Sequence, residues 1–303
     1  MIQLESADIC VSIKEMGAEL CSVFHKNSGK EFMWKGDPAY WGKHSPVLFP
    51  IVGALKENTY YYKNQPYILP RHGFARERVF AVLNQSERKV TLLLKEDETS
   101  LKIYPFPFEL RITYSLENNC LQVRYQVKNT GGGLMYFSLG AHPAFAVPFD
   151  GGNYGDYFLE FEKTENAPRW PISADGLIEE QPVGFFHDEN RLKLTKELFM
   201  GDALVFKGLK SGRISVMSVH SDAHLDFEFR QFPYFGIWAA KQANFVCLEP
   251  WCGIADSVHT DQQLVHKEGI NKLDPGTIFE REWKLCVSVQ GWSHPVPRPR
   301  ATG

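Results

Sequence analysis

The sequence lacks any long hydrophobic run, and this and other absences exclude several classes of protein. A helix needs about 20 consecutive apolar residues to cross a bilayer, and no stretch of these 303 residues reaches that length. The first residues, Met1–Glu5, contain no basic segment leading into an apolar one, so we expect no secretory signal and a cytoplasmic protein. The formal net charge of −3 offers no basic footprint, so we expect neither nucleic acid nor a membrane as a partner.

Paired cysteines, phosphate loops and metal-ligand spacings are also missing. The six cysteines are scattered without a C-x-x-C pair, and in a cytoplasmic chain we expect them to be reduced and mostly buried. They are Cys10, Cys21, Cys120, Cys247, Cys252 and Cys286. No glycine-rich loop is present to hold a nucleotide, and no local spacing of histidines, cysteines and acids marks a metal site. We therefore expect neither a cofactor nor a metal.

What the sequence does have is a repeated two-residue alternation of apolar and polar side chains. In residues 108–116 the even positions are apolar, and in 121–128 the phase switches after a polar turn at 117–120. This pattern predicts an antiparallel hairpin with one face in water. Further strand-like segments are 79–83, 90–94, 225–229 and 279–289.

Helical periodicity is scarce, with short candidates only at 195–199 and 257–267. Many short strands and little helix predict an all-β fold, a large antiparallel β-sandwich. No internal repeat or low-complexity linker divides the chain before residue 291, so we expect a single domain over residues 1–290. Residues 291–303 begin Trp-Ser-His-Pro and are rich in proline and arginine, which is typical of a purification tag or a disordered tail.

Two histidine motifs are candidates for chemistry. His72 lies in the segment Arg71–Arg76, and a histidine between arginines and followed by glycine makes a poor core strand. His142 ends an apolar run and precedes Pro143, which favours an extended backbone at the histidine. Taken alone, a surface turn explains the first motif, and a core histidine at a strand end explains the second.

Glu249 is the most informative single residue because it lies inside the apolar segment Val246–Trp251. Burying a carboxylate costs on the order of several kcal/mol unless the group is paired or its pKa shifts. A structural ion pair with an arginine and a carboxylate tuned as a base in a partly dry cleft explain this position equally well. Asp202 precedes another apolar run and, taken alone, is a turn or cap aspartate.

Taken together and in their order along the chain, the motifs resemble those of the aldose 1-epimerase (galactose mutarotase-like) superfamily, and of its bacterial LacX-type branch in particular. The segments that carry the resemblance are His72–Arg76, Gly140–Pro143 and Cys247–Trp251. Further matches are Gly17–Leu20, Trp34–Asp37, Trp41 and Pro46–Gly53. The resemblance covers nearly the whole chain before residue 291, and it is specific to the superfamily but not to one sugar.

This resemblance implies a β-supersandwich with a sugar site on one concave face, and an isomerase that interconverts the anomers of an aldose without a cofactor. The family's base glutamate corresponds to Glu249, its two ring-oxygen histidines to His72 and His142, and its hydroxyl-binding aspartate to Asp202. Ring opening needs a base at the anomeric hydroxyl O1 and an acid at the ring oxygen O5, and a carboxylate with a histidine fits that division. Glu249 would take the O1 proton while protonated His142 gives one to O5, and the roles would reverse on closure.

The substrate-binding arginine is where the sequence departs from the family pattern. The galactose enzymes supply it from an Asn-x-x-Gly-Arg motif that this chain lacks. Arg71 and Arg76 flank His72 instead and are the candidates for that contact. Sugar rings have apolar faces, so Phe74, Trp238 and Trp251 are candidates to stack on the substrate, although each is also a natural core aromatic.

Three other functions fit part of the pattern. Two histidines and one carboxylate are the ligand set of non-haem iron oxygenases, although the histidine and acid two residues apart that such enzymes usually have are missing. A non-catalytic sugar-binding protein on the same fold would carry the same residues. A hexose 6-phosphate 1-epimerase would use arginines such as Arg71, Arg76 and Arg78 to hold the phosphate.

Overall fold

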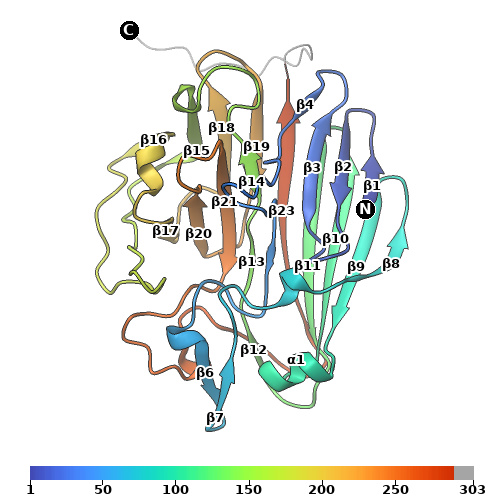
Figure 1. Ribbon diagram of the computed structural model, residues 1–303, viewed down its shortest axis with the longest axis vertical. Helices are drawn as coiled ribbons and strands as arrows, with labels where there is room; N and C mark the ends of the chain where they lie inside the picture. The colour runs from blue at the N-terminus through green and yellow to red at the C-terminus, as the bar shows by residue number, and fades with distance from the viewer. Residues whose placement is uncertain (290–303) are drawn as a thin grey trace.

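The computed structural model describes residues 1–289, which form antiparallel sheets with little helix (Figure 1). The expected tail at 291–303 lies outside the described residues. The largest sheet has nine strands. From one edge to the other they are β16 (Glu189–Lys193), β15 (Tyr157–Glu165), β18 (Arg213–Ser218), β19 (His224–Glu228), β23 (Ile278–Ser288), β11 (Cys120–Asn129), β10 (Phe108–Glu117), β9 (Lys89–Lys95) and β8 (Ala81–Gln85).

A six-stranded sheet and a four-stranded sheet supply most of the other layer. The six-stranded sheet contains β17 (Leu204–Lys207), β20 (Tyr234–Trp238), β21 (Phe245–Cys252), β13 (Leu139–Ala141) and β5 (Val47–Leu48), with β14 (Ala144–Ala146) also paired to β21. The four-stranded sheet is β1 (Ile2–Glu5), β2 (Ile9–Ile13), β3 (Leu20–His25) and β4 (Lys30–Glu31). Two-stranded pairs are β6 (Thr59–Tyr62) with β7 (Gln65–Ile68), and β12 (Met135–Phe137) with β22 (Asn271–Leu273).

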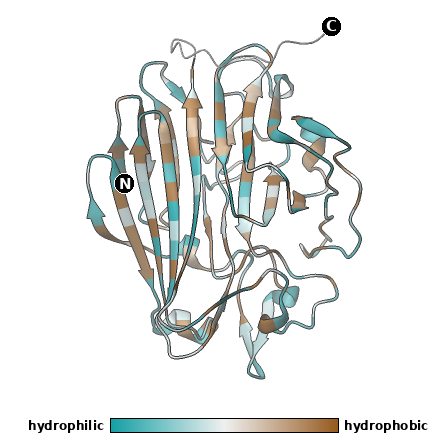
Figure 2. Ribbon diagram, turned by 180° about the vertical axis from the view of Figure 1, so that it is seen from behind, coloured by the Kyte–Doolittle hydropathy of each residue, from teal (hydrophilic) through white to brown (hydrophobic). Residues whose placement is uncertain are grey.

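The predicted hairpin is confirmed as β10 and β11, which pair antiparallel from Phe108 opposite Asn129 to Glu117 opposite Cys120. Along β10, buried and partly exposed residues alternate for nine positions because successive side chains point to opposite faces of the sheet. Figure 2 shows this alternation as bands of hydrophobic and hydrophilic residues along the strands. The apolar set of each strand therefore points into the sandwich.

Aromatic pairs join the two layers through the core. Phe145 of β14 meets Phe227 of β19 with ring centroids 5.6 Å apart, and Phe49, which follows β5, meets Phe108 of β10 at 4.9 Å. Burying each such side chain contributes about 1.5–3 kcal/mol. One continuous cluster of buried residues extends from the first strand to the last, and the single domain over residues 1–290 stays a prediction.

Helix is confined to short segments of the described chain. The α-helix α1 (Glu98–Ile103) is capped by Asp97, whose side chain accepts from the Ser100 backbone N–H at 2.6 Å. The candidate at 195–199 forms a single 3-10 turn, Lys196–Phe199. Other 3-10 turns are Lys56–Asn58, Ala75–Glu77, Tyr154–Asp156 and Leu264–His266. No helix in this part of the chain is long and apolar enough to cross a membrane.

The expected helix at 257–267 is wrong, because side-chain contacts fix this segment as turns. The Asp261 side chain accepts from the Gln263 backbone N–H and contacts His266 at 2.7 Å. At the end of the segment, Lys267 is buried and its ammonium lies 2.7 Å from the buried Asp256 carboxylate. This ion pair ties the end of the segment to Asp256, which directly follows Ala255, a residue of the pocket described below.

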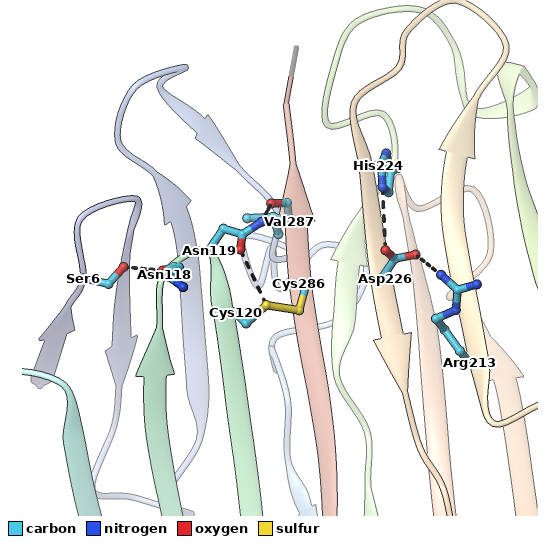
Figure 3. The surroundings of a disulfide bond; sticks show 9 residues. All are labelled: Ser6, Asn118, Asn119, Cys120, Arg213, His224, Asp226, Cys286 and Val287. Carbon is cyan, nitrogen blue, oxygen red and sulfur yellow. Dashed lines mark hydrogen bonds and ion pairs between the residues drawn. A yellow bond between two sulfur atoms is a disulfide. The ribbon is translucent and has the colours of Figure 1, made fainter. Parts of the chain in front are cut away.

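The expectation that all six cysteines are reduced is wrong for one pair. Cys120 of β11 and Cys286 of β23 form a disulfide (Figure 3). The two residues lie directly opposite each other in the nine-stranded sheet, with their Cα atoms 4.1 Å apart. Neighbouring Asn119 ties the turn to β23 by donating to the Val287 carbonyl at 2.7 Å. The four free cysteines are Cys10, Cys21, Cys247 and Cys252.

Candidate active site

A pocket of about 780 Å³ lies over the six-stranded sheet, which is large enough for a small organic ligand. Its walls come from the ends of β17, β20 and β21 and from the loops beside them. Most of the residues that the sequence singled out line it. They are Arg71, His72, Arg76, His142, Asp202, Trp238, Glu249 and Trp251.

Glu249 reaches the pocket from β21, a strand whose eight residues are all buried. Its neighbour across the sheet is Gly236 of β20, and Gly140 of β13 lies opposite Trp251. A Cβ atom at Gly236 would come within 2.5 Å of the Trp251 ring, and one at Gly140 within 2.7 Å. The two glycines thus leave room for the indole to lie across the neighbouring strands on the same face as Glu249.

His142 and Glu249 are in direct polar contact at the wall of the pocket. His142 follows β13 directly, and its Nε2 lies 3.2 Å from the Glu249 Oε2. The two residues are only 8% and 2% exposed. Burial raises the pKa of Glu249 well above its ordinary value, and the nearby charge of Asp202 raises it further. Burial also lowers the pKa of His142 to about 3. Both effects favour a neutral carboxylic acid beside a neutral imidazole.

His72 is held by an exchange of hydrogen bonds with Gly53. The His72 backbone N–H donates to the Gly53 carbonyl at 2.9 Å, and the Gly53 N–H donates to His72 Nδ1 at 3.1 Å. Because Nδ1 accepts a hydrogen bond, we assign the proton of the neutral ring to Nε2. Burial lowers the pKa of His72 well below its ordinary value, so the ring is a neutral N–H donor.

Backbone conformation explains why a glycine follows His72. His72 and Gly73 both adopt left-handed conformations, with φ of 69° and 72°. A Cβ at Gly73 would lie 2.3 Å from the Phe49 carbonyl oxygen, so only glycine allows this turn to pack against the chain after β5. The turn places the His72 and His142 ring centroids 5.8 Å apart.

Two tryptophans enclose His142. Trp41 stacks on the imidazole with ring centroids 5.0 Å apart and an interplanar angle of 27°, and Trp238 meets it edge-on at 5.6 Å. Both line the pocket. The sequence pattern named Trp41 only as a family match and gave it no role, because nothing near it in the chain indicates contact with a residue 101 positions away.

Charged groups lie at other positions around the pocket. Arg76 donates from Nη2 to the Arg71 carbonyl at 2.9 Å. The Arg71 guanidinium packs against Gly176, where a Cβ would fall within 1.8 Å of Nη2. Asp202 is a partly buried lining residue, and Lys241 is an exposed lining residue that the sequence did not single out. Arg71 and Lys241 form no ion pair with any described residue.

Phe74 is placed in the core and not at the pocket, which corrects its assignment as a sugar-stacking residue. Its ring is buried among Phe49, Tyr104 and Phe108. The Arg78 guanidinium carbon lies 5.7 Å from the centroid of the same ring. Arg78 is not among the described residues that line the pocket. The aromatic residues that do line it are Trp41, Phe199, Trp238 and Trp251.

The two histidines and one carboxylate that matched the ligands of iron oxygenases, His72, His142 and Glu249, do not form a close group among the described residues. His72 engages its Nδ1 with Gly53, and the group with ligand-like spacing is instead His142, Cys247 and Glu249, whose donor atoms all lie within 4.8 Å of one another. A second such group, Glu19, Cys21 and His44, lies outside the pocket.

Comparisons with known proteins agree with the motifs. A model of the aldose 1-epimerase family matches residues 1–280. The chain is 34% identical to the chromosomal protein LacX of Lactococcus lactis subsp. lactis, over 94% of this chain and 99% of that protein. It is also similar to the structure of a galactose mutarotase related enzyme from Lactobacillus acidophilus, with 36% identity, a TM-score of 0.89 and coverage of 95% and 97%. A galactose mutarotase-like protein from Lactobacillus casei ATCC 334 has 31% identity, a TM-score of 0.89 and coverage of 95% and 100%.

Proposed function

Because this chain belongs to the aldose 1-epimerase family, we propose that it interconverts the α and β anomers of an aldose by acid–base ring opening. The proposed reaction takes place in the cytoplasm and needs neither a metal nor an organic cofactor. The single observation that supports it best is the contact of 3.2 Å between His142 and Glu249 at the wall of a sugar-sized pocket.

The pair holds the one proton that the reaction needs. A neutral Glu249 with a neutral His142 contains the same number of protons as a Glu249 carboxylate with a His142 imidazolium. When a sugar enters, transfer of this proton to His142 leaves Glu249 able to accept the O1 proton while His142 donates to O5. The C1–O5 bond breaks, the aldehyde rotates about C1–C2, and closure on the other face returns both protons. Each positioned group typically contributes about 10²–10⁴-fold to such a rate.

The other residues of the pocket bind and orient the sugar in this proposal. The Gly53 N–H occupies His72 Nδ1, and the two histidine rings lie 5.8 Å apart, so His72 would use its Nε2–H to donate a hydrogen bond to O5 without changing its own charge. Trp251 and Trp238 offer flat apolar surfaces for the sugar ring. Asp202 and Arg76 supply an acceptor and donors for sugar hydroxyls.

The proposal is tested by polarimetry of freshly dissolved α-D-glucose and α-D-galactose. The optical rotation should reach equilibrium faster with the protein than without it, in proportion to protein concentration. A protein that binds an aldose by calorimetry but leaves the rate unchanged would be the sugar-binding alternative, and the enzymatic proposal would be rejected.

A sugar phosphate is a second candidate substrate, favoured by the positive groups of the pocket. Arg71 and Lys241 line it without an ion-pair partner among the described residues, and guanidinium groups bind phosphate in bidentate geometry. Comparing glucose with glucose 6-phosphate decides between the two. If the phosphate is the substrate, Arg71→Gln should raise its KM at least tenfold and leave the KM of glucose within about twofold, because a lost charge-assisted hydrogen bond is worth about 1.5–3 kcal/mol.

A further inference from the structure

A buried thiol adjoins the proposed acid–base pair. Cys247 lies two residues before Glu249 on β21, so both side chains point to the same face of the strand. Cys247 is fully buried, and it pairs across the sheet with Ala144, two residues after His142. Ring opening of an aldose makes no use of a thiol, so the proposed function leaves this position unexplained.

The three side chains match the ligands that zinc prefers. Zn²⁺ binds thiolate, imidazole and carboxylate groups in tetrahedral geometry at about 2.0–2.3 Å, which corresponds to about 3.3–3.8 Å between neighbouring donor atoms. The donor atoms of His142, Cys247 and Glu249 all lie within 4.8 Å of one another, and the His142–Glu249 contact is 3.2 Å. Small side-chain rotations would therefore complete a three-ligand site. The fourth position would face the pocket, because His142 and Glu249 line it.

We propose that His142, Cys247 and Glu249 bind Zn²⁺ and that the bound ion inhibits the enzyme. Zinc would form bonds to one His142 nitrogen, the Cys247 sulfur and a Glu249 oxygen, and would release the thiol and carboxyl protons to solvent without any redox change. The inhibitory part rests on the proposed function, since the ion would occupy the two groups that exchange protons with the sugar. Metal binding itself does not depend on that function.

The second group with ligand-like spacing, Glu19, Cys21 and His44, is less available to a metal ion. The Glu19 carboxylate already accepts from the backbone N–H groups of His44 and Ser45, at 2.7 and 3.2 Å. The ammonium of Lys14 lies 3.9 Å from the same carboxylate and competes with a cation. Cys21, the thiol of this second group, is therefore a position at which substitution should leave zinc binding unchanged.

Binding is measured first, by calorimetry with ZnCl₂ and by the thiolate-to-metal charge-transfer absorption of added Co²⁺. The wild-type protein should bind one ion, and Cys247→Ala should weaken zinc binding at least tenfold and abolish the absorption band. Cys252→Ala is the matched control, because Cys252 is another buried free thiol of β21. Cys247→Ser retains the side-chain volume and should also lose the band, which guards against a folding defect in the alanine variant. Unchanged binding in both Cys247 variants, or loss only in Cys21→Ala, would overturn the site.

Inhibition is measured second, by polarimetry, with each variant compared with its own rate in EDTA. Zinc should slow the wild type and Cys252→Ala at least tenfold and should slow Cys247→Ala less than twofold. Full activity of the wild type with zinc bound would overturn the inhibitory role. A protein with no mutarotase activity in EDTA would contradict the proposed function instead, and the calorimetry and absorption would still decide the metal site.

Discussion

His142 Nε2 lies 3.2 Å from Glu249 Oε2, and both side chains are almost completely shielded from water at the wall of the pocket. Burial disfavours the charged form of each group, so it lowers the pKa of His142 and raises the pKa of Glu249. A shared proton at a dry wall is suited to acid–base chemistry on a sugar. It also makes the stability of the fold depend on pH in a direction that can be worked out.

The first prediction concerns the stability of the fold at acidic pH. The pKa of His142 is about 3 in the folded protein, against an ordinary value of 6.5. A depressed pKa gives stability that is present above pH 6.5 and is lost as pH falls toward 3, because the unfolded chain takes up the proton first. His142→Gln should therefore lose less stability than the wild type over this interval. Thermal unfolding at a series of pH values measures it, with His266→Gln as an exposed control. If the melting temperatures of the wild type and His142→Gln fell in parallel with pH, the lowered pKa of His142 would be contradicted.

The second prediction concerns the opposite side of the pH range. The pKa of Glu249 is raised well above its ordinary value of 4.5, so its contribution to stability is complete below pH 4.5 and is lost as pH rises toward the folded-state pKa. Glu249→Gln removes this loss because the amide does not ionise. The difference in melting temperature, variant minus wild type, should increase from pH 5 to pH 8. A difference that stays constant would show that Glu249 is ionised in the folded protein.

The third prediction concerns the disulfide. Cys120 and Cys286 join two strands of the nine-stranded sheet across 166 residues of sequence, whereas the pocket lies over the six-stranded sheet. Replacing both with serine should lower the free energy of unfolding by about 2–5 kcal/mol and leave the mutarotation rate within about twofold. Urea unfolding with and without dithiothreitol measures the first effect. Dithiothreitol should destabilise the wild type and leave the double variant unchanged, and equal sensitivity of both would argue that no such bond forms in solution.

The fourth prediction concerns the floor of the pocket. A Cβ at Gly236 would lie within 2.5 Å of the Trp251 ring, so Gly236→Ala must displace the indole or the strand. Overpacking of this kind typically costs about 1–3 kcal/mol, and here the displaced Trp251 ring lines the pocket. We expect weaker aldose binding by calorimetry together with a lower melting temperature. Gly132→Ala is the control, because the space around Gly132 is open. Equal sugar affinity in Gly236→Ala and the wild type would exclude a role for Trp251 in binding.

Local patterns in the sequence predicted much of the fold. The β10–β11 hairpin was predictable because its partners are adjacent in the chain and alternate in polarity. The disulfide was not, because Cys120 and Cys286 come together only through the order of strands in the nine-stranded sheet. The helix expected at 257–267 failed for a related reason, since the buried pair of Lys267 with Asp256 sets the path of that segment.

The site could be predicted only in part, for reasons that differ between residues. Glu249 was detectable because an acid within an apolar strand is costly without a function or a partner. His72 and His142 needed the family resemblance, because each motif alone has an ordinary structural explanation. Phe74 was assigned wrongly because it lies only two residues after His72, which lines the pocket. Closeness in sequence within a turn does not fix the side to which each ring points, and the Phe74 ring packs in the core.

The most direct test of the account is polarimetry of α-D-glucose and α-D-galactose with wild-type protein and Glu249→Gln, at equal concentration and neutral pH. The amide is nearly isosteric with the acid but cannot accept the O1 proton, so sugar affinity by calorimetry should stay within about threefold while the rate falls by about 10²–10⁴-fold. The fold is verified for each protein by its thermal transition. Mutarotation by Glu249→Gln at the wild-type rate would contradict the central claim that this buried carboxyl group is the base at the anomeric hydroxyl.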